Sequence, residues 1–145
     1  LIGILSDVLA ILIVRQAGGW VGVALAVVGA AVTIYGSWLV MTGTTGFTLA
    51  GFVSTIGFGF IGLWLALVAW SPEAASWWGG WLTLVRIGAV AMVVGGLFAV
   101  PGALMRIDAF EAVPGWLWLF SLGWLGVYVL YPIATLVLGR RLGSL

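Results

Sequence analysis

The sequence contains no cysteine, no histidine, no lysine and no asparagine among its 145 residues. Without cysteine it has no disulfide, no thiolate nucleophile and no cysteine-ligated iron–sulfur cluster. Without histidine it lacks the commonest protein ligand for haem, zinc or copper and the commonest general base. The absence of lysine excludes a Schiff base of the kind that retinal forms. We therefore predict no metal site and no cofactor held by this chain alone, and leave a bound lipid or pigment as an alternative.

Charged residues are scarce, because five arginines and four acidic residues make up 6% of the chain while 64% of it is hydrophobic. A soluble domain carries about 25% charged residues, which coat the surface that faces water. This chain cannot coat itself in that way, so the lipid bilayer is its expected surrounding. No cluster of basic and aromatic residues is present, and we expect no nucleic-acid partner.

Long apolar segments are abundant, and about 20 apolar residues are enough to cross the roughly 30 Å hydrocarbon core of a membrane. Four segments have that length, namely Trp20–Met41, Phe47–Trp70, Trp81–Met105 and Gly115–Gly139. A fifth, Leu1–Val14, would cover only about 21 Å as a helix. It is expected to continue upstream, to enter the bilayer part-way or to be a cleaved signal peptide. The sequence predicts an all-α fold, a polytopic transmembrane helical bundle of four full spans plus a shorter first helix, in a single domain over residues 1–145.

The connections between the predicted spans carry turn and helix-cap signals. The segment Thr42–Gly46 is short, polar and flanked by glycine, which suits a tight turn between antiparallel helices. The next connection predicts a short interfacial helix that has Ser71 as its N-cap and ends at the glycine pair 79–80. Asp108 and Glu111 have capping-box spacing in a loop that offers no partner base or ligand, and we expect this loop to face water.

The charges also predict an orientation. With five spans, one side of the membrane carries Arg15, Glu73, Arg140 and Arg141, with Arg86 nearest to it, and the other side carries Arg106 as its one basic residue. The positive-inside rule makes the first side cytoplasmic, together with the C-terminus. The absence of lysine and asparagine beside abundant alanine, glycine, valine and tryptophan indicates a GC-rich bacterial genome. The predicted location is therefore the inner membrane of a bacterial cell.

Small residues recur at four-residue spacing in three of the spans. The stripes are Gly22, Ala26 and Ala30; Gly51, Thr55 and Gly59; and Gly95, Ala99 and Ala103. Such stripes let helix backbones approach closely where no hydrophobic force drives helices together. We interpret them as packing surfaces inside the bundle, with contact to a partner protein as the alternative.

Most of the ten tryptophans lie near the predicted membrane interfaces, where aromatic residues commonly form belts. Trp64 and Trp124 lie deeper in their spans. Together with Phe58, Phe98 and Phe120 they are candidates to line an apolar ligand pocket. Core packing is the favoured interpretation of the same residues. Pro132 lies within the last span and predicts a helix kink, with Thr135 bonding back to a carbonyl one turn earlier.

Arg86 stands inside an apolar run, where an unpaired charge costs a few kcal/mol unless it reaches the interface or a partner. One interpretation is that its long side chain extends to lipid phosphates. The other is an intramembrane ion pair with Asp7, the one acid within a predicted span. We predict the Asp7–Arg86 pair, as a structural contact that makes the first and fourth spans neighbours.

Two resemblances follow from these patterns. Five Trp-rich spans in this length are similar in architecture to the tryptophan-rich sensory protein family, which binds porphyrins and sterols. That family's Pro-Pro loop and Gln/Asn/Trp signature are absent, so no residue role is transferred. The segments "GGLFAVPGALMRIDAF" and "GVYVLYPIATLVLGRRL" resemble the closing part of uncharacterised multi-spanning bacterial membrane proteins that end in Tyr-Pro and then Leu-Gly-Arg.

The sequence shows no acid pair, catalytic triad, phosphate-binding loop or metal-ligand spacing, and we expect no enzyme. Its hydroxyl residues are scattered rather than aligned along the spans, which disfavours ion transport. The predicted function is that of a non-catalytic accessory or structural subunit of a larger membrane assembly, with other membrane protein subunits as partners. The alternative is a binding or transport module for an apolar small molecule such as a lipid, quinone, carotenoid or porphyrin.

Overall fold

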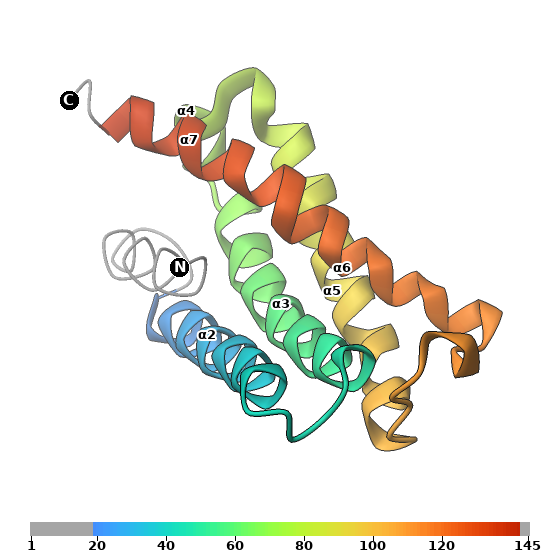
Figure 1. Ribbon diagram of the computed structural model, residues 1–145. Coiled ribbons are helices and arrows are strands. Elements are labelled where there is room, and N and C mark those ends of the chain that lie inside the picture. The colour runs from blue at the N-terminus through green and yellow to red at the C-terminus, as the bar shows by residue number, and fades with distance from the viewer. Residues whose placement is uncertain (1–18, 143–145) are drawn as a thin grey trace.

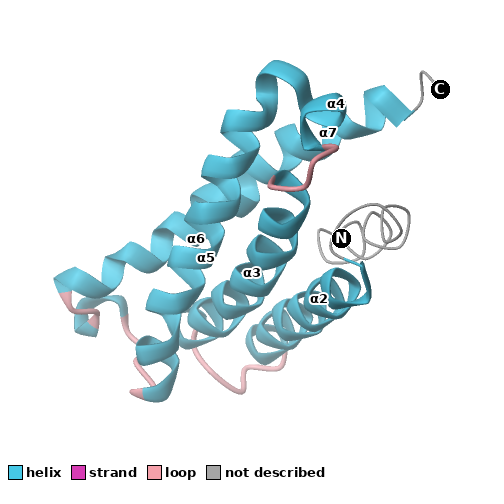
Figure 2. Cartoon of the chain, turned by 180° about the vertical axis from the view of Figure 1, so that it is seen from behind, coloured by secondary structure: helices cyan, strands magenta, loops and turns pink. Residues whose placement is uncertain are grey.

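The computed structural model describes residues 19–142, and every regular element in that range is helical (Figures 1 and 2). The long helices are α2 (Gly19–Met41), α3 (Phe47–Ala69) and α5 (Leu82–Leu104). The last span consists of η3 (Gly115–Phe120), α6 (Ser121–Leu125), the π-helical turn η4 (Gly126–Leu130) and α7 (Tyr131–Leu142). Shorter elements are α4 (Ala74–Trp78) and the 3-10 turns η1 (Gly79–Trp81) and η2 (Phe110–Ala112).

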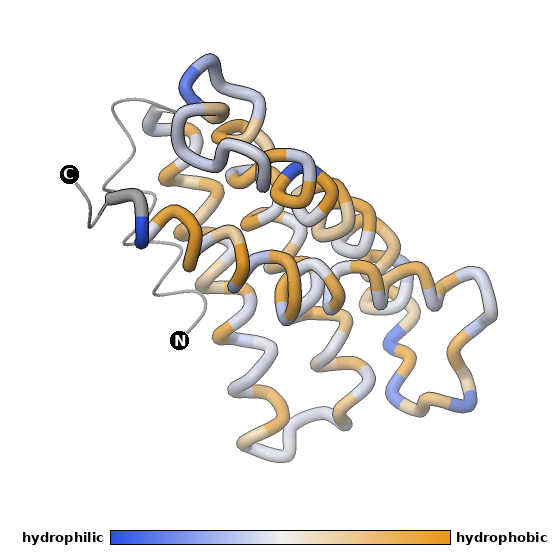
Figure 3. Tube along the Cα trace, turned by 90° about the horizontal axis from the view of Figure 1, so that it is seen from above, coloured by the Kyte–Doolittle hydropathy of each residue, from blue (hydrophilic) through white to orange (hydrophobic). Residues whose placement is uncertain are grey.

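Four of these stretches are long and apolar enough to cross a membrane, which confirms the predicted all-α class. The predicted first helix, Leu1–Val14, lies outside the described residues. Helix α2 packs against α3, α3 against α5, and α5 against the last span (Figures 1 and 2). Hydrophilic residues gather mainly at the ends of the helices and in their connections, and apolar residues fill the spans between them (Figure 3).

The small-residue stripes lie inside the bundle, as predicted. Gly22, Ala26 and Ala30 are buried, and so are the central members of the other two stripes. Helices α3 and α5 approach closely at Gly59 and Gly96, where a Cβ added to Gly96 would lie 2.6 Å from the Gly59 Cα. Backbone contact of this kind explains why glycine is needed at these positions.

The first connection is the tight turn that the sequence predicts. Gly43 adopts a φ of 67°, and the Thr44 N–H donates to the Leu39 carbonyl at 3.0 Å, which closes the C-terminus of α2. The predicted N-cap of α4 is wrong. Glu73 occupies the N-cap position, and the Ser71 hydroxyl is buried without a hydrogen-bond partner among residues 19–142.

Pro132 is the second residue of α7, and the π-helical turn η4 immediately precedes that helix. Proline has no N–H to continue the helical ladder, and a π-helical turn is a common site of helix distortion. The irregularity predicted at Pro132 therefore begins before the proline, at Gly126. The Thr135 hydroxyl donates to the Pro132 carbonyl at 2.9 Å, which confirms the predicted back-bond.

Candidate functional site

The five aromatic residues proposed for an apolar pocket do not line a common cavity. Trp64 is 2% exposed and packs edge-on against Tyr131, with ring centroids 6.5 Å apart. Phe120 is 1% exposed and packs against Phe52 at 4.7 Å. Phe98 contacts the ring of Trp116, at 6.3 Å. These three residues contribute to packing within the bundle.

The other two, Phe58 and Trp124, line a cavity of about 250 Å³ between α2, α3 and the last span. Its wall also includes Ser37 and Ser54, so the cavity carries hydroxyl groups as well as aromatic surface. The Trp124 Nε1 donates to the Thr55 hydroxyl at 2.8 Å, and that hydroxyl donates to the Gly51 carbonyl at 2.7 Å. The indole is thereby held in one orientation beside the cavity.

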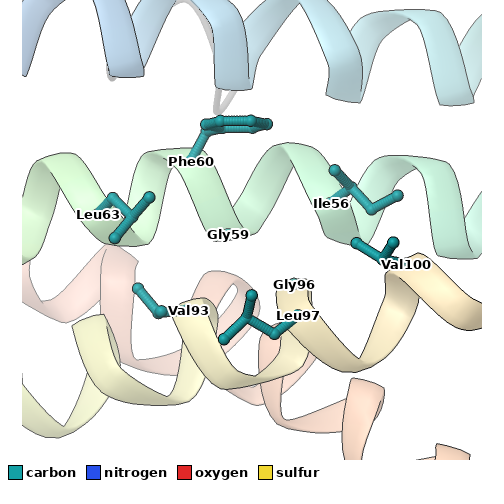
Figure 4. Close-up of a pocket in the computed structure, with 8 residues that line it drawn as sticks. All are labelled: Ile56, Gly59, Phe60, Leu63, Val93, Gly96, Leu97 and Val100. Carbon is teal, nitrogen blue, oxygen red and sulfur yellow. The ribbon is translucent and has the colours of Figure 1, made fainter.

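A second cavity, of about 140 Å³, opens on the surface formed by α3 and α5. Figure 4 shows Gly59 and Gly96 on its floor, with the last span behind the two helices. Its walls are hydrocarbon only, from Ile56, Phe60, Leu63, Val93, Leu97 and Val100. We call this feature the α3–α5 groove.

Arg86 is bound to the end of α3. Its Nε donates to the carbonyl of Ala69, the last residue of α3, at 3.0 Å. Its guanidinium carbon lies 5.1 Å from the ring centroid of Trp70. The last carbonyls of a helix lack partners within it and form the negative end of its dipole, so the cation is well placed there. Asp7, its predicted partner, lies outside the described residues, and the pair remains a prediction.

Beside Arg86 an open cavity of about 450 Å³ extends along α5. We call it the Arg86 groove, and it is lined by Trp70, Thr83, Arg86, Ile87, Val90, Ala91, Val94 and Leu122. The Trp70 contact and the Ala69 bond were missed by sequence reasoning. Trp70 was a usable signal, because it lies on the same side of the membrane as Arg86, at the end of the preceding predicted span.

Asp108 has a role that differs from its predicted one. Its Oδ2 accepts from the Gly46 N–H at 2.9 Å and its Oδ1 from the Leu49 N–H at 3.4 Å. Asp108 therefore caps the N-terminus of α3 from the connection that follows α5. It is exposed, as expected of a water-facing loop, but its two amide partners were not predicted. A carboxylate at this position also matches the positive end of the α3 dipole.

No protein-family model, curated protein or solved structure matches the chain. Within residues 19–142 no three acidic side chains lie close enough together to hold a metal ion.

Proposed function

We propose that the chain is a non-catalytic integral membrane protein that serves as an accessory or structural subunit of a larger membrane assembly. The observation that carries the proposal is that polar side chains in the described spans form hydrogen bonds within the protein. Thr33, Thr55 and Trp124 bond within and between the helices, and Arg86 bonds to the end of α3. Groups engaged in this way hold the bundle together.

The α3–α5 groove supports the same proposal. Leu97 on its rim is 66% exposed, and the floor is backbone at two glycines. A cavity of about 150 Å³ holds one benzene molecule, so this groove of about 140 Å³ fits one large apolar side chain. Small residues that admit a neighbour's side chain are typical of helix–helix contacts in membranes. We assign the groove to a transmembrane helix of a partner subunit.

A photo-crosslinking residue introduced at Leu97 tests this assignment in intact membranes. We expect irradiation to give one discrete protein adduct, because the side chain borders the groove. The matched control is Leu125, which is 49% exposed and lies outside the three cavities described above. Adducts with lipid alone from Leu97, or the same protein adduct from both positions, would contradict the assignment.

Binding of an apolar small molecule, such as a lipid, quinone, carotenoid or porphyrin, is the second candidate. The cavity beside Phe58 and Trp124 favours it, but its volume of about 250 Å³ is below the roughly 300 Å³ at which ligand pockets begin. Native mass spectrometry in mild detergent separates the two functions. A heavier complex with another protein supports the first, and a retained small molecule that is not a membrane phospholipid supports the second.

We further propose that the protein lies in a bacterial inner membrane with the C-terminal end of α7 in the cytoplasm. Successive spans alternate in direction, which places the end of α3, the start of α5 and the end of α7 on one side. Arg86, Arg140 and Arg141 belong to that side, whereas Arg106 stands with two acids in the connection after α5. The positive-inside rule favours the cytoplasm for the arginine-rich side.

The chain has no cysteine, so single cysteines test the orientation without background. Thr44 and Ser76 are both exposed and lie in connections at opposite ends of α3. A Thr44→Cys variant is expected to react with an impermeant thiol reagent in spheroplasts. A Ser76→Cys variant is expected to react only after the membrane is permeabilised, and the reverse pattern would overturn the orientation.

A further inference from the structure

The Arg86 groove is about as long, measured along α5, as the hydrocarbon part of one membrane leaflet is thick. Thr83, Arg86, Ile87, Val90 and Val94 line it from one face of α5, with Trp70 at one end and Leu122 contributed by α6. The helical rise from Thr83 to Val94 is about 16 Å. Half of the roughly 30 Å hydrocarbon core is about 15 Å. The groove therefore extends from the membrane interface to about the midplane.

Arg86, at the polar end of the groove, uses only part of its hydrogen-bonding capacity within residues 19–142. A guanidinium has five N–H donors, and Arg86 uses its Nε–H on the Ala69 carbonyl. Among residues 19–142 its two Nη groups have no hydrogen bond or ion pair, and Glu73, the acid on this side, does not pair with it. The Ala69 bond and the Trp70 ring together fix where the guanidinium lies.

We propose that the Arg86 groove binds one anionic phospholipid from the leaflet on its side. The phosphate accepts hydrogen bonds from the two Nη groups, an arrangement for which the flat guanidinium is suited. The proposal thus takes the lipid-phosphate interpretation of Arg86 in place of the Asp7 pair. The Thr83 hydroxyl lies one turn earlier on the same helix as a further donor. One acyl chain follows Ile87, Val90 and Val94 toward Leu122. The inference is independent of the partner subunit, because the α3–α5 groove is lined by other residues.

The test uses the delipidated protein in mild detergent, titrated with phosphatidylglycerol or phosphatidylcholine of identical acyl chains and followed by native mass spectrometry. We expect one retained phosphatidylglycerol and at least about tenfold weaker retention of phosphatidylcholine. Arg86→Gln should weaken phosphatidylglycerol binding by about tenfold or more, since a charge-assisted bidentate contact is lost. The control Arg140→Gln removes the same charge on the same side and should leave binding unchanged.

A second variant tests the acyl chain separately. Ala91 lines the groove and is half-buried, so Ala91→Phe should obstruct the chain while leaving the guanidinium in place. We expect it to weaken phosphatidylglycerol binding, and we expect soluble glycerol phosphate not to compete. Equal retention of the two lipids, equal effects of the two arginine variants, or no effect of Ala91→Phe would each overturn the proposal. Competition by glycerol phosphate would show an anion site without the lipid and would overturn it as well.

Discussion

Replacing Gly95 with alanine is expected to lower the free energy of unfolding by about 3 kcal/mol, because α5 and α6 leave no room for a methyl group. A Cβ on Gly95 would overlap the backbone nitrogen of Gly123 and lie 2.8 Å from the Phe120 carbonyl oxygen. These are helix backbone atoms, which cannot rotate away as a side chain can. The two helices must therefore separate, and overpacking of this kind typically costs 1–3 kcal/mol.

Gly139→Ala is the matched control for this prediction. Gly139 is also helical, but a Cβ added there would meet no heavy atom within 4 Å. We expect this variant to unfold at the same or a slightly higher temperature, since alanine favours a helix by up to about 1 kcal/mol over glycine. Thermal unfolding in one detergent measures both. Similar losses in the two variants would mean that glycine content, and not the Gly95–Gly123 contact, limits stability.

The first and last residues of the spans could be predicted closely, because each segment must by itself be long and apolar enough to cross the bilayer. The predicted Trp20–Met41 is found as Gly19–Met41, and Trp81–Met105 as Leu82–Leu104. Hydropathy along the chain contains this information without knowledge of neighbouring helices. The interior packing of the small-residue stripes was predictable for a related reason, since only small residues allow backbones to touch.

The rotation of each span could not be predicted in the same way. Met92 is buried and Leu97 is 66% exposed, although both are apolar and lie on α5. In lipid the outer surface of a helix is as apolar as its inner surface, so residue type does not distinguish them. For that reason Trp64 and Phe120 entered the same predicted pocket as Trp124, although the structure buries them in the core.

The partners of the charged residues were missed because they are main-chain groups. Asp108 accepts from the Gly46 and Leu49 amides, and Arg86 donates to the Ala69 carbonyl. Every residue except proline carries such an amide, so the sequence gives no sign of which helix end a charge will reach. A search restricted to oppositely charged side chains finds Asp7 for Arg86 and no partner for Asp108.

Trp78→Ala is expected to destabilise the protein by about 3–5 kcal/mol, the usual cost of removing a buried tryptophan or phenylalanine. Trp78 is 2% exposed and lies in the same core cluster as Tyr131 and Leu138 of α7. Its Nε1 donates to the Ala134 carbonyl at 3.0 Å. This side chain therefore connects α4, which is only one turn and a half long, to the last span.

Two further variants separate the contributions of packing and hydrogen bonding. Trp78→Phe keeps most of the ring and loses the hydrogen bond, so we expect a loss of about 1 kcal/mol. Trp81→Ala removes the same kind of side chain from a position that is 48% exposed, and it should cost much less than Trp78→Ala.

Thermal unfolding ranks the stabilities of the three variants, and hydrogen exchange shows which part of the protein is destabilised. In Trp78→Ala the amides of α4 should exchange faster while those at the α3–α5 crossing keep their protection, because that crossing does not depend on Trp78. Uniformly faster exchange would instead mean that Trp78 supports the whole bundle and not the attachment of α4 alone.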